Sequence, residues 1–124
     1  MSATQFERLL SPLDLGRKQV RNRIVFPAVV SNYAAANMIT DRFIDYYAER
    51  ARGGAGMIIT EALVVHPTSI AQPSVVTLFD DRNDAGLAKL AARVESEGAR
   101  LLGQLWHVGR QQLWNPVSSP VGVS

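Results

Sequence analysis

The sequence predicts an α/β fold with a parallel sheet, and three observations predict it. Strand-like and helix-like segments alternate along the chain, an order that is typical of parallel sheets covered by helices. The strand-like segments are centred on Val25, Ile58 and Leu102, at spacings that suit successive βα units. Three strands and two helices in 124 residues leave both sheet edges and one sheet face uncovered, whereas a closed eight-stranded barrel needs about 250 residues. We therefore expect the opening part of a larger α/β domain.

The N-terminal region predicts a hairpin followed by a strand. Two short extended pieces, Leu13–Leu15 and Gln19–Arg21, flank a turn that Gly16 and the two charged residues after it supply. The next run, Arg23–Pro27, is rich in β-branched and aromatic residues, and its proline ends it. This run is the first strong strand candidate.

The segment Thr40–Gly54 predicts the first helix. Thr40 caps its start, and Asp41 lies in the first turn, where the helix dipole favours a negative charge. Glycines at the end of the segment stop the helix. The strand Gly56–Ala62 follows at once, and its core is apolar without alternation, as expected of a strand covered on both faces.

The second half of the sequence predicts a long loop, a helix and a strand. We expect Leu63–Asp81 to be the loop, with a short strand at Val75–Leu78. The helix is Asn83–Gly98, with Asp81 or Asn83 as its cap and apolar residues every three to four positions. Arg100–Trp106 is the third strand, and the residues after it are irregular.

Composition excludes several classes of protein. The chain has no cysteine, so it holds no disulfide, zinc–thiolate site or cysteine-bound iron–sulfur cluster. The net charge of +2 comes from scattered basic residues, and nucleic-acid binding needs a denser patch. No apolar run approaches the roughly 20 residues that span a bilayer, and the N-terminus lacks a signal-peptide core, so we expect a cytoplasmic protein without a membrane partner. His66 and His107 have no acidic partner at metal-ligand spacing, which predicts no metal site.

The carboxyl ends of the three strands carry the candidate binding residues, because α/β folds bind their ligands there. Small apolar side chains at Ala28, Val29 and Ala62 would let a flat ring lie against the backbone. Gln104 offers a donor and an acceptor, which suit the edge of a pyrimidine-like ring. Each residue also has a purely structural interpretation: Ala62 as a packing residue, for example, or Glu61 as an ion-paired residue of the sheet. The sequence lacks the glycine-rich phosphate-binding motifs of nucleotide-binding folds.

Several motifs, in order, give the chain a resemblance to the Old Yellow Enzyme family of FMN oxidoreductases. The matching segments cover nearly the whole chain and are Leu10–Leu13 with Leu15–Gly16, Arg21–Pro27, Tyr46–Gly56, Ile58–Glu61 and Gln104–Arg110. Each motif alone is weak evidence for this family, and together, in this order, they are strong evidence. The resemblance implies that residues 1–124 form the N-terminal part of a single FMN-binding (β/α)8 TIM barrel, in which the hairpin is a lid over the bottom of the barrel.

The resemblance also implies a cofactor site. Pro27, Ala28, Val29 and Val30 would lie along the flavin, Ala62 would contact the ring near its pyrimidine edge, and Gln104 would hydrogen-bond that edge. Family members often carry Thr or Cys at the Val30 position, where a hydrogen bond tunes the flavin potential, and valine cannot make this bond. NADH or NADPH would reduce the flavin, and the reduced flavin would pass a hydride to an activated alkene or enoyl compound.

Two functional hypotheses follow. In the first, the chain is part of an FMN-dependent ene-reductase. The family's substrate-anchoring pair and tyrosine acid would then lie later than this sequence, so we expect no catalytic residue within it. In the second, the chain is a non-catalytic truncated homologue that is stable only through self-association or a partner chain, because three strands do not close a barrel. The two hypotheses are compatible.

Overall fold

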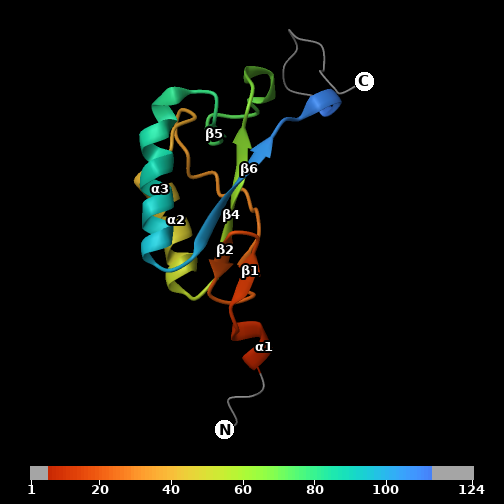
Figure 1. The fold of residues 1–124 in the computed structure, drawn as a ribbon. Coiled ribbons are helices and arrows are strands. Elements are labelled where there is room, and N and C mark those ends of the chain that lie inside the picture. Colours follow the sequence, from red (N-terminus) through yellow and green to blue (C-terminus); the bar gives the residue numbers. More distant parts are fainter. Residues whose placement is uncertain (1–5, 113–124) are drawn as a thin grey trace.

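The computed structural model describes residues 6–112 of the chain, and within them strands and helices alternate as the sequence predicts (Figure 1). The predicted irregular tail lies largely outside the described residues. The elements are α1 (Glu7–Leu10), β1 (Leu13–Leu15), β2 (Lys18–Val20), β3 (Val25–Phe26), α2 (Asp41–Arg52), β4 (Met57–Val64), η1 (Pro67–Ser69), β5 (Val76–Thr77), η2 (Asp81–Asn83), α3 (Asp84–Ser96), β6 (Arg100–Trp106) and η3 (Gly109–Gln111).

Strand β4 is the centre of a parallel sheet. Strand β6 pairs with β4 along one edge, from Met57 beside Arg100 to Val64 beside Trp106. On the other edge, β3 pairs with the start of β4 and the short β5 pairs with its end. All of these pairings are parallel, so the carboxyl ends of β3, β4 and β6 point the same way.

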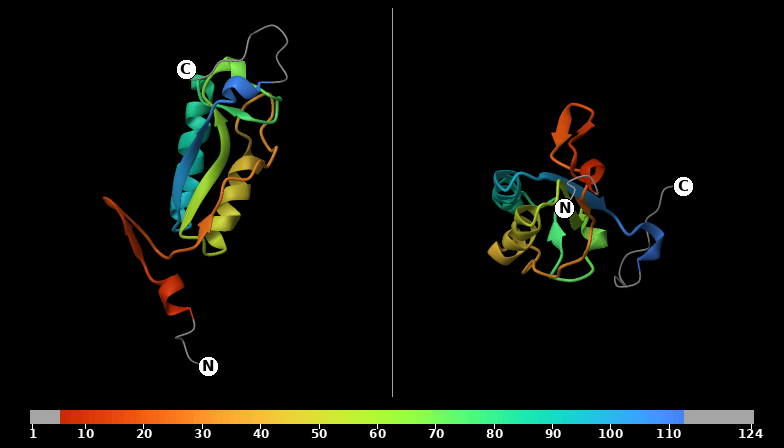
Figure 2. Two further views of the ribbon diagram at one scale, coloured as in Figure 1. Left: turned by 90° about the vertical axis from the view of Figure 1, so that its right-hand side faces the viewer. Right: turned by 90° about the horizontal axis from the view of Figure 1, so that it is seen from below.

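Helices α2 and α3 cover one face of this sheet, and the core lies between them and β4 (Figures 1 and 2). The fully buried apolar side chains come from α2, β4 and α3 and include Phe43, Tyr47, Ile58, Leu90 and Val94. Helix α2 begins as predicted, because the Thr40 hydroxyl accepts a hydrogen bond from the Phe43 N–H at 3.1 Å. Arg21 fastens the helix ends to the chain before β3, donating to the carbonyls of Ala51, Ala55 and Glu97.

The opposite face of the sheet is open in the part of the chain that the structure describes. Val25 and Leu102 are 42% and 44% exposed there, and Met57 and Ile59 between them are only half-buried. The predicted uncovered face is therefore confirmed, and the predicted cover on both faces of Gly56–Ala62 is wrong. Alternate residues at the start of β4 face the helices and the open side, so the apolar run supplies both a buried face and a half-buried one.

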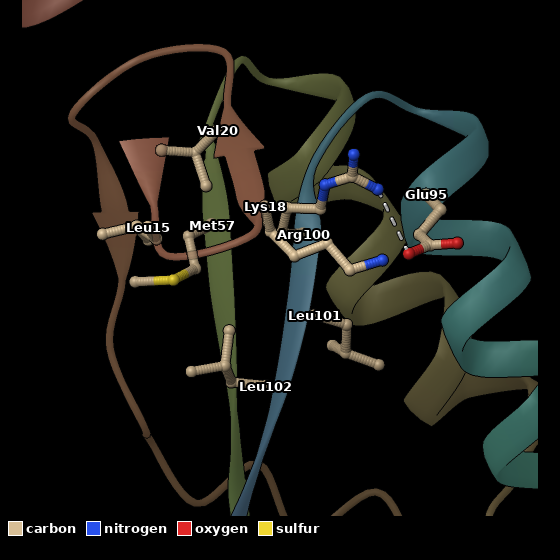
Figure 3. Close-up of a pocket in the computed structure, with 8 residues that line it drawn as sticks. All are labelled: Leu15, Lys18, Val20, Met57, Glu95, Arg100, Leu101 and Leu102. Carbon is tan, nitrogen blue, oxygen red and sulfur yellow. Dashed lines mark hydrogen bonds and ion pairs between the residues drawn. The ribbon is translucent and has the colours of Figure 1, made fainter. Parts of the chain in front are cut away.

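The hairpin of β1 and β2 lies near the end of the sheet where the strands begin (Figures 1 and 2). A hollow of about 270 Å³ separates it from β4, β6 and α3 (Figure 3). Leu15, Val20, Met57 and Leu102 give this hollow an apolar side, and Arg100 pairs with Glu95 at its edge, at 3.4 Å (Figure 3). The second strand of the hairpin is Lys18–Val20, one residue earlier than the predicted Gln19–Arg21.

The other departures from the sequence-based predictions are explained by side-chain hydrogen bonds, one of them local and one between distant segments. The predicted strand Arg23–Pro27 is reduced to Val25–Phe26, with the Asn22 side chain accepting the Ile24 N–H at 3.1 Å. Of the two predicted caps of α3, Asn83 occupies the N-cap position, but its side chain accepts the Ile39 N–H at 2.9 Å and makes no capping bond; Asp80 caps the short η2. Within residues 6–112, no helix has the length and apolar character needed to cross a membrane.

Candidate functional site

Two of the predicted binding residues are neighbours on the sheet. Ala62 of β4 lies in register with Gln104 of β6, near the carboxyl ends of both strands. Gln104 is exposed and Ala62 is half-buried. Residues in register on parallel strands point to the same face, so the methyl group and the amide lie side by side on the open face.

A β-bulge in β4 brings Ala62 to this position. Ile59 is in register with Leu102, and the next matched pair is Ala62 with Gln104, so Thr60 and Glu61 together oppose the single residue Gly103. Thr60 and Glu61 are both buried, at 1% exposure each. Without the extra residue, the alternation of β4 would bury Ala62 and leave Glu61 on the open face.

Hydrogen bonds fix the bulge from both sides. The Thr60 hydroxyl accepts the backbone N–H of Gln104 at 3.1 Å and donates to the Glu61 carbonyl at 2.9 Å. The backbone N–H of Glu61 donates to the hydroxyl of Tyr47, on helix α2, at 2.7 Å. Burial raises the pKa of this tyrosine well above its ordinary value, and the nearby Glu61 carboxylate adds to the rise.

The Glu61 side chain joins β4 to the chain beyond β3. Its Oε2 accepts the backbone N–H of Ser31 at 2.5 Å, whereas its Oε1 has no hydrogen-bond partner among residues 6–112. The sequence signal for this residue is a carboxylate directly after an apolar run. That signal left a structural role and a ligand role open, and the contact with Ser31 was not predicted.

The other predicted binding residues form the segment that leaves β3. Pro27 is exposed, Ala28 is half-buried, and Val29 and Val30 are 46% and 52% exposed. Past them the backbone takes a left-handed conformation at Asn32, with φ of 58°. This segment therefore presents uncharged and mainly apolar side chains at the same end of the sheet as Ala62 and Gln104.

The Asn32 side chain ties this segment to the loop between η1 and β5. Its Oδ1 accepts hydrogen bonds from Gln72 Nε2 at 2.5 Å and from Ser74 Oγ at 3.0 Å. The position of the segment is therefore set at two successive points, by Glu61 at Ser31 and by the loop at Asn32.

A pair of histidines lies at the carboxyl ends of β4 and β6. The rings of His66 and His107 are 5.9 Å apart between centroids, and Thr68 Oγ1 bridges them at 2.9 Å and 3.1 Å. The contact between these histidines was not predicted, because they lie far apart in the sequence. The described part of the chain holds no cluster of His, Cys, Asp or Glu that would bind a metal ion. Trp114, a further aromatic residue of the sequence, lies outside the described residues.

The chemistry of this end of the sheet fits a flat, uncharged heterocycle. Ala62 leaves room above the backbone, Gln104 presents an exposed amide with both donor and acceptor atoms, and Val29 and Val30 supply exposed apolar surface after β3, at the same end of the sheet. Among residues 6–112, the only carboxylate in the strands of this sheet is that of Glu61, which is buried and turned toward Ser31.

Comparisons with known proteins agree on one family. Residues 8–121 match the model of the NADH:flavin oxidoreductase / NADH oxidase family. An NADH oxidase of Thermoanaerobacter brockii is 41% identical over an alignment of 110 positions, which covers 87% of this chain and 17% of that protein. An N,N-dimethylglycine/sarcosine dehydrogenase of Chromohalobacter salexigens is 32% identical over an alignment of 124 positions, which covers 96% of this chain and 18% of that protein.

Solved structures give the same result. A 2-naphthoyl-CoA reductase in complex with 2-naphthoyl-CoA matches with a TM-score of 0.83 and 32% identity, covering 88% of this chain and 17% of that one. The old yellow enzyme of Trypanosoma cruzi matches with a TM-score of 0.76 and 32% identity, covering 87% of this chain and 29% of that one. The chain therefore spans less than a third of the length of each of these proteins.

Proposed function

The chain belongs to the NADH:flavin oxidoreductase / NADH oxidase family, and we propose that it supplies one wall of the FMN site of an ene-reductase of the Old Yellow Enzyme type. The superpositions confirm the predicted fold class, the N-terminal part of a (β/α)8 barrel preceded by a hairpin lid. NADH or NADPH would be the reductant, and an activated alkene or enoyl compound the substrate. A cytoplasmic location and the absence of nucleic-acid and membrane partners stay predictions.

The observation that carries this proposal is the register of Ala62 with Gln104 at the carboxyl ends of β4 and β6. Gln104 would donate to and accept from the pyrimidine part of the flavin, and Ala62 would let the ring approach the backbone beside it. Pro27, Ala28, Val29 and Val30 would form the adjoining wall. The uncharged character of this wall supports an aromatic heterocycle over a free phosphate.

When bound, FMN would supply the hydride chemistry, and this chain would position the group and shield it from water. Val29 and Val30 would exclude water on their side of the ring. Because the Val30 side chain has no hydrogen-bonding atom, it would leave the flavin potential to the ring's other contacts. We assign no catalytic residue within the described chain.

Titration of the full chain with FMN tests the proposal. Binding should quench flavin fluorescence and shift the flavin absorption bands, and Gln104→Leu should weaken FMN binding by about tenfold, as expected for losing a buried hydrogen-bond pair. Gln19→Leu, in the hairpin, is the matched control and should leave the dissociation constant unchanged. Absence of flavin binding by the unmodified protein, or equal affinity for the Gln104→Leu variant, would contradict the proposal.

A second proposal concerns the chain by itself, and the open face of the sheet favours it. We propose that the 124-residue chain self-associates through the side of the sheet that carries Val25 and Leu102, because contiguous exposed apolar surface favours association. Leu102→Lys should shift the chain toward monomer in size-exclusion chromatography with light scattering, and Leu10→Lys on α1 should not. A monomeric unmodified chain at tens of micromolar would refute this second proposal.

A further inference from the structure

We propose that Glu61 is a positioning residue for the wall of the proposed FMN site that Pro27, Ala28, Val29 and Val30 form. In this proposal its carboxylate holds the segment from Pro27 to Ser31 in place through one hydrogen bond, and the negative charge itself is not required. The inference rests on the proposed FMN site and assigns the part of β4 that fixes its geometry.

The β-bulge aims Glu61 at this segment. The extra residue in β4 turns Glu61 away from the open face, and the N–H of Glu61 is taken up by the Tyr47 hydroxyl at 2.7 Å, instead of the neighbouring strand. The backbone of Glu61 is thus anchored to helix α2. Its side chain, 1% exposed, reaches the Ser31 N–H from this rigid base.

The segment needs such a hold because β3 ends early. Regular pairing with β4 stops at Phe26, and Val29 and Val30 are about half exposed. The 2.5 Å bond between Glu61 Oε2 and Ser31 N therefore fastens the far end of a run that the sheet holds only at its start. A loss of this bond would let the wall move relative to Ala62 and Gln104, which lie on β4 and β6.

The second oxygen separates two possible roles for Glu61. Oε1 is buried and has no hydrogen-bond partner within residues 6–112. A buried oxygen without a donor is unfavourable, so a residue that acts only through Oε2 should tolerate an uncharged amide. Glutamine retains one carbonyl oxygen for the Ser31 N–H and removes the unpartnered charge, whereas methionine retains the length and removes the acceptor.

The experiment compares Glu61→Gln and Glu61→Met, with Glu97→Met as the matched control. Glu97 makes an ion pair with Arg93 at the far end of α3, remote from the wall. Two quantities are measured for each full-length protein: hydrogen exchange of the Ser31 amide without flavin, and the dissociation constant of FMN. The melting temperature serves as a check on folding.

We expect Glu61→Met to speed exchange at the Ser31 amide and to weaken FMN binding, each by about tenfold, which corresponds to one lost hydrogen bond of ordinary strength. Glu61→Gln should restore both values to within about twofold, and Glu97→Met should change neither. If Glu61→Gln fails as Glu61→Met does while the protein still folds, the charge is required and the inference is overturned.

The same measurements separate this inference from the proposed function. If FMN does not bind the unmodified protein, the proposed function fails, and with it the role of Glu61 toward a flavin. If Gln104→Leu weakens FMN binding and Glu61→Met does not, the flavin site stands and the inference is refuted. Unchanged exchange at Ser31 in Glu61→Met refutes it without any flavin present.

Discussion

The backbone N–H of Gln104 donates to the hydroxyl of Thr60 at 3.1 Å, across the one place where the ladder between β4 and β6 loses its register. The hydroxyl also donates to the Glu61 carbonyl. A side chain thus supplies, at the bulge, the hydrogen bonding that the irregular backbone does not. The pair that carries the proposed function, Ala62 and Gln104, follows directly after this contact.

Replacing Thr60 with valine should therefore destabilise the protein. Valine has nearly the same shape, so the change removes the hydroxyl and leaves the Gln104 N–H and the Glu61 carbonyl without it. We expect the free energy of unfolding to fall by about 1–3 kcal/mol, measured by urea denaturation. Thr60→Ser retains the hydroxyl and should lose less, about 1 kcal/mol for the missing methyl group. An unchanged free energy of unfolding in Thr60→Val would show that the hydroxyl contributes nothing.

Tyr47 stabilises the bulge from the helix side, so Tyr47→Phe should lower the free energy of unfolding. The change leaves the ring in the core and the Glu61 N–H without an acceptor. We expect a loss of about 1–3 kcal/mol in the free energy of unfolding. Tyr46→Phe, on the same helix and half-buried, is the control and should cost less than about 0.5 kcal/mol. An unchanged free energy of unfolding in Tyr47→Phe would mean that the Glu61 N–H finds another acceptor.

The same tyrosine predicts how stability changes at alkaline pH. Burial, with help from the Glu61 carboxylate, raises the pKa of Tyr47 in the folded state above its ordinary value of about 10. A raised folded pKa means that the stabilisation is fully present below pH 10 and is lost as the pH rises beyond it. The urea midpoint of the unmodified protein should fall between pH 9 and pH 11. The fall should be smaller in Tyr47→Phe, and an equal fall in both proteins would assign it to other groups.

Much of the fold could be predicted because its signals are local. Thr40, the apolar stripe behind it and the glycines after Arg52 define helix α2 within a few residues, and β6 has the predicted limits. Asn83 is the N-cap residue of α3 as predicted, but its side chain makes a distant contact in place of the capping bond. The Asn83 side chain accepts a hydrogen bond from the Ile39 N–H and donates one to the Thr77 carbonyl, and no local sequence pattern indicates these bonds.

The site could be predicted only in part, because its geometry depends on pairing between strands. The identities of Ala62 and Gln104 were available from the sequence. Their position side by side depends on the bulge, and simple alternation along β4 gives the wrong face for Ala62 and Glu61. The contact between Glu61 and Ser31 joins segments that meet only once β3 and β4 pair.

The two histidines show the same dependence and give the last prediction, which concerns their tautomers. His107 Nδ1 accepts the Gly109 N–H at 2.9 Å, and His66 Nδ1 accepts the Thr68 N–H at 3.3 Å. An atom that accepts from a backbone N–H carries no proton, so each neutral ring must hold its proton on Nε2. His107 Nε2–H then donates to Thr68 Oγ1, and the hydroxyl donates onward to His66 Nδ1. Long-range proton–nitrogen NMR at pH 8 should find the Nε2–H form for both residues. Thr68→Val should release that preference more at His66, which loses its hydroxyl donor, than at His107, which retains Gly109. A proton on Nδ1 of either ring in the unmodified protein would show that this chain of donors does not form.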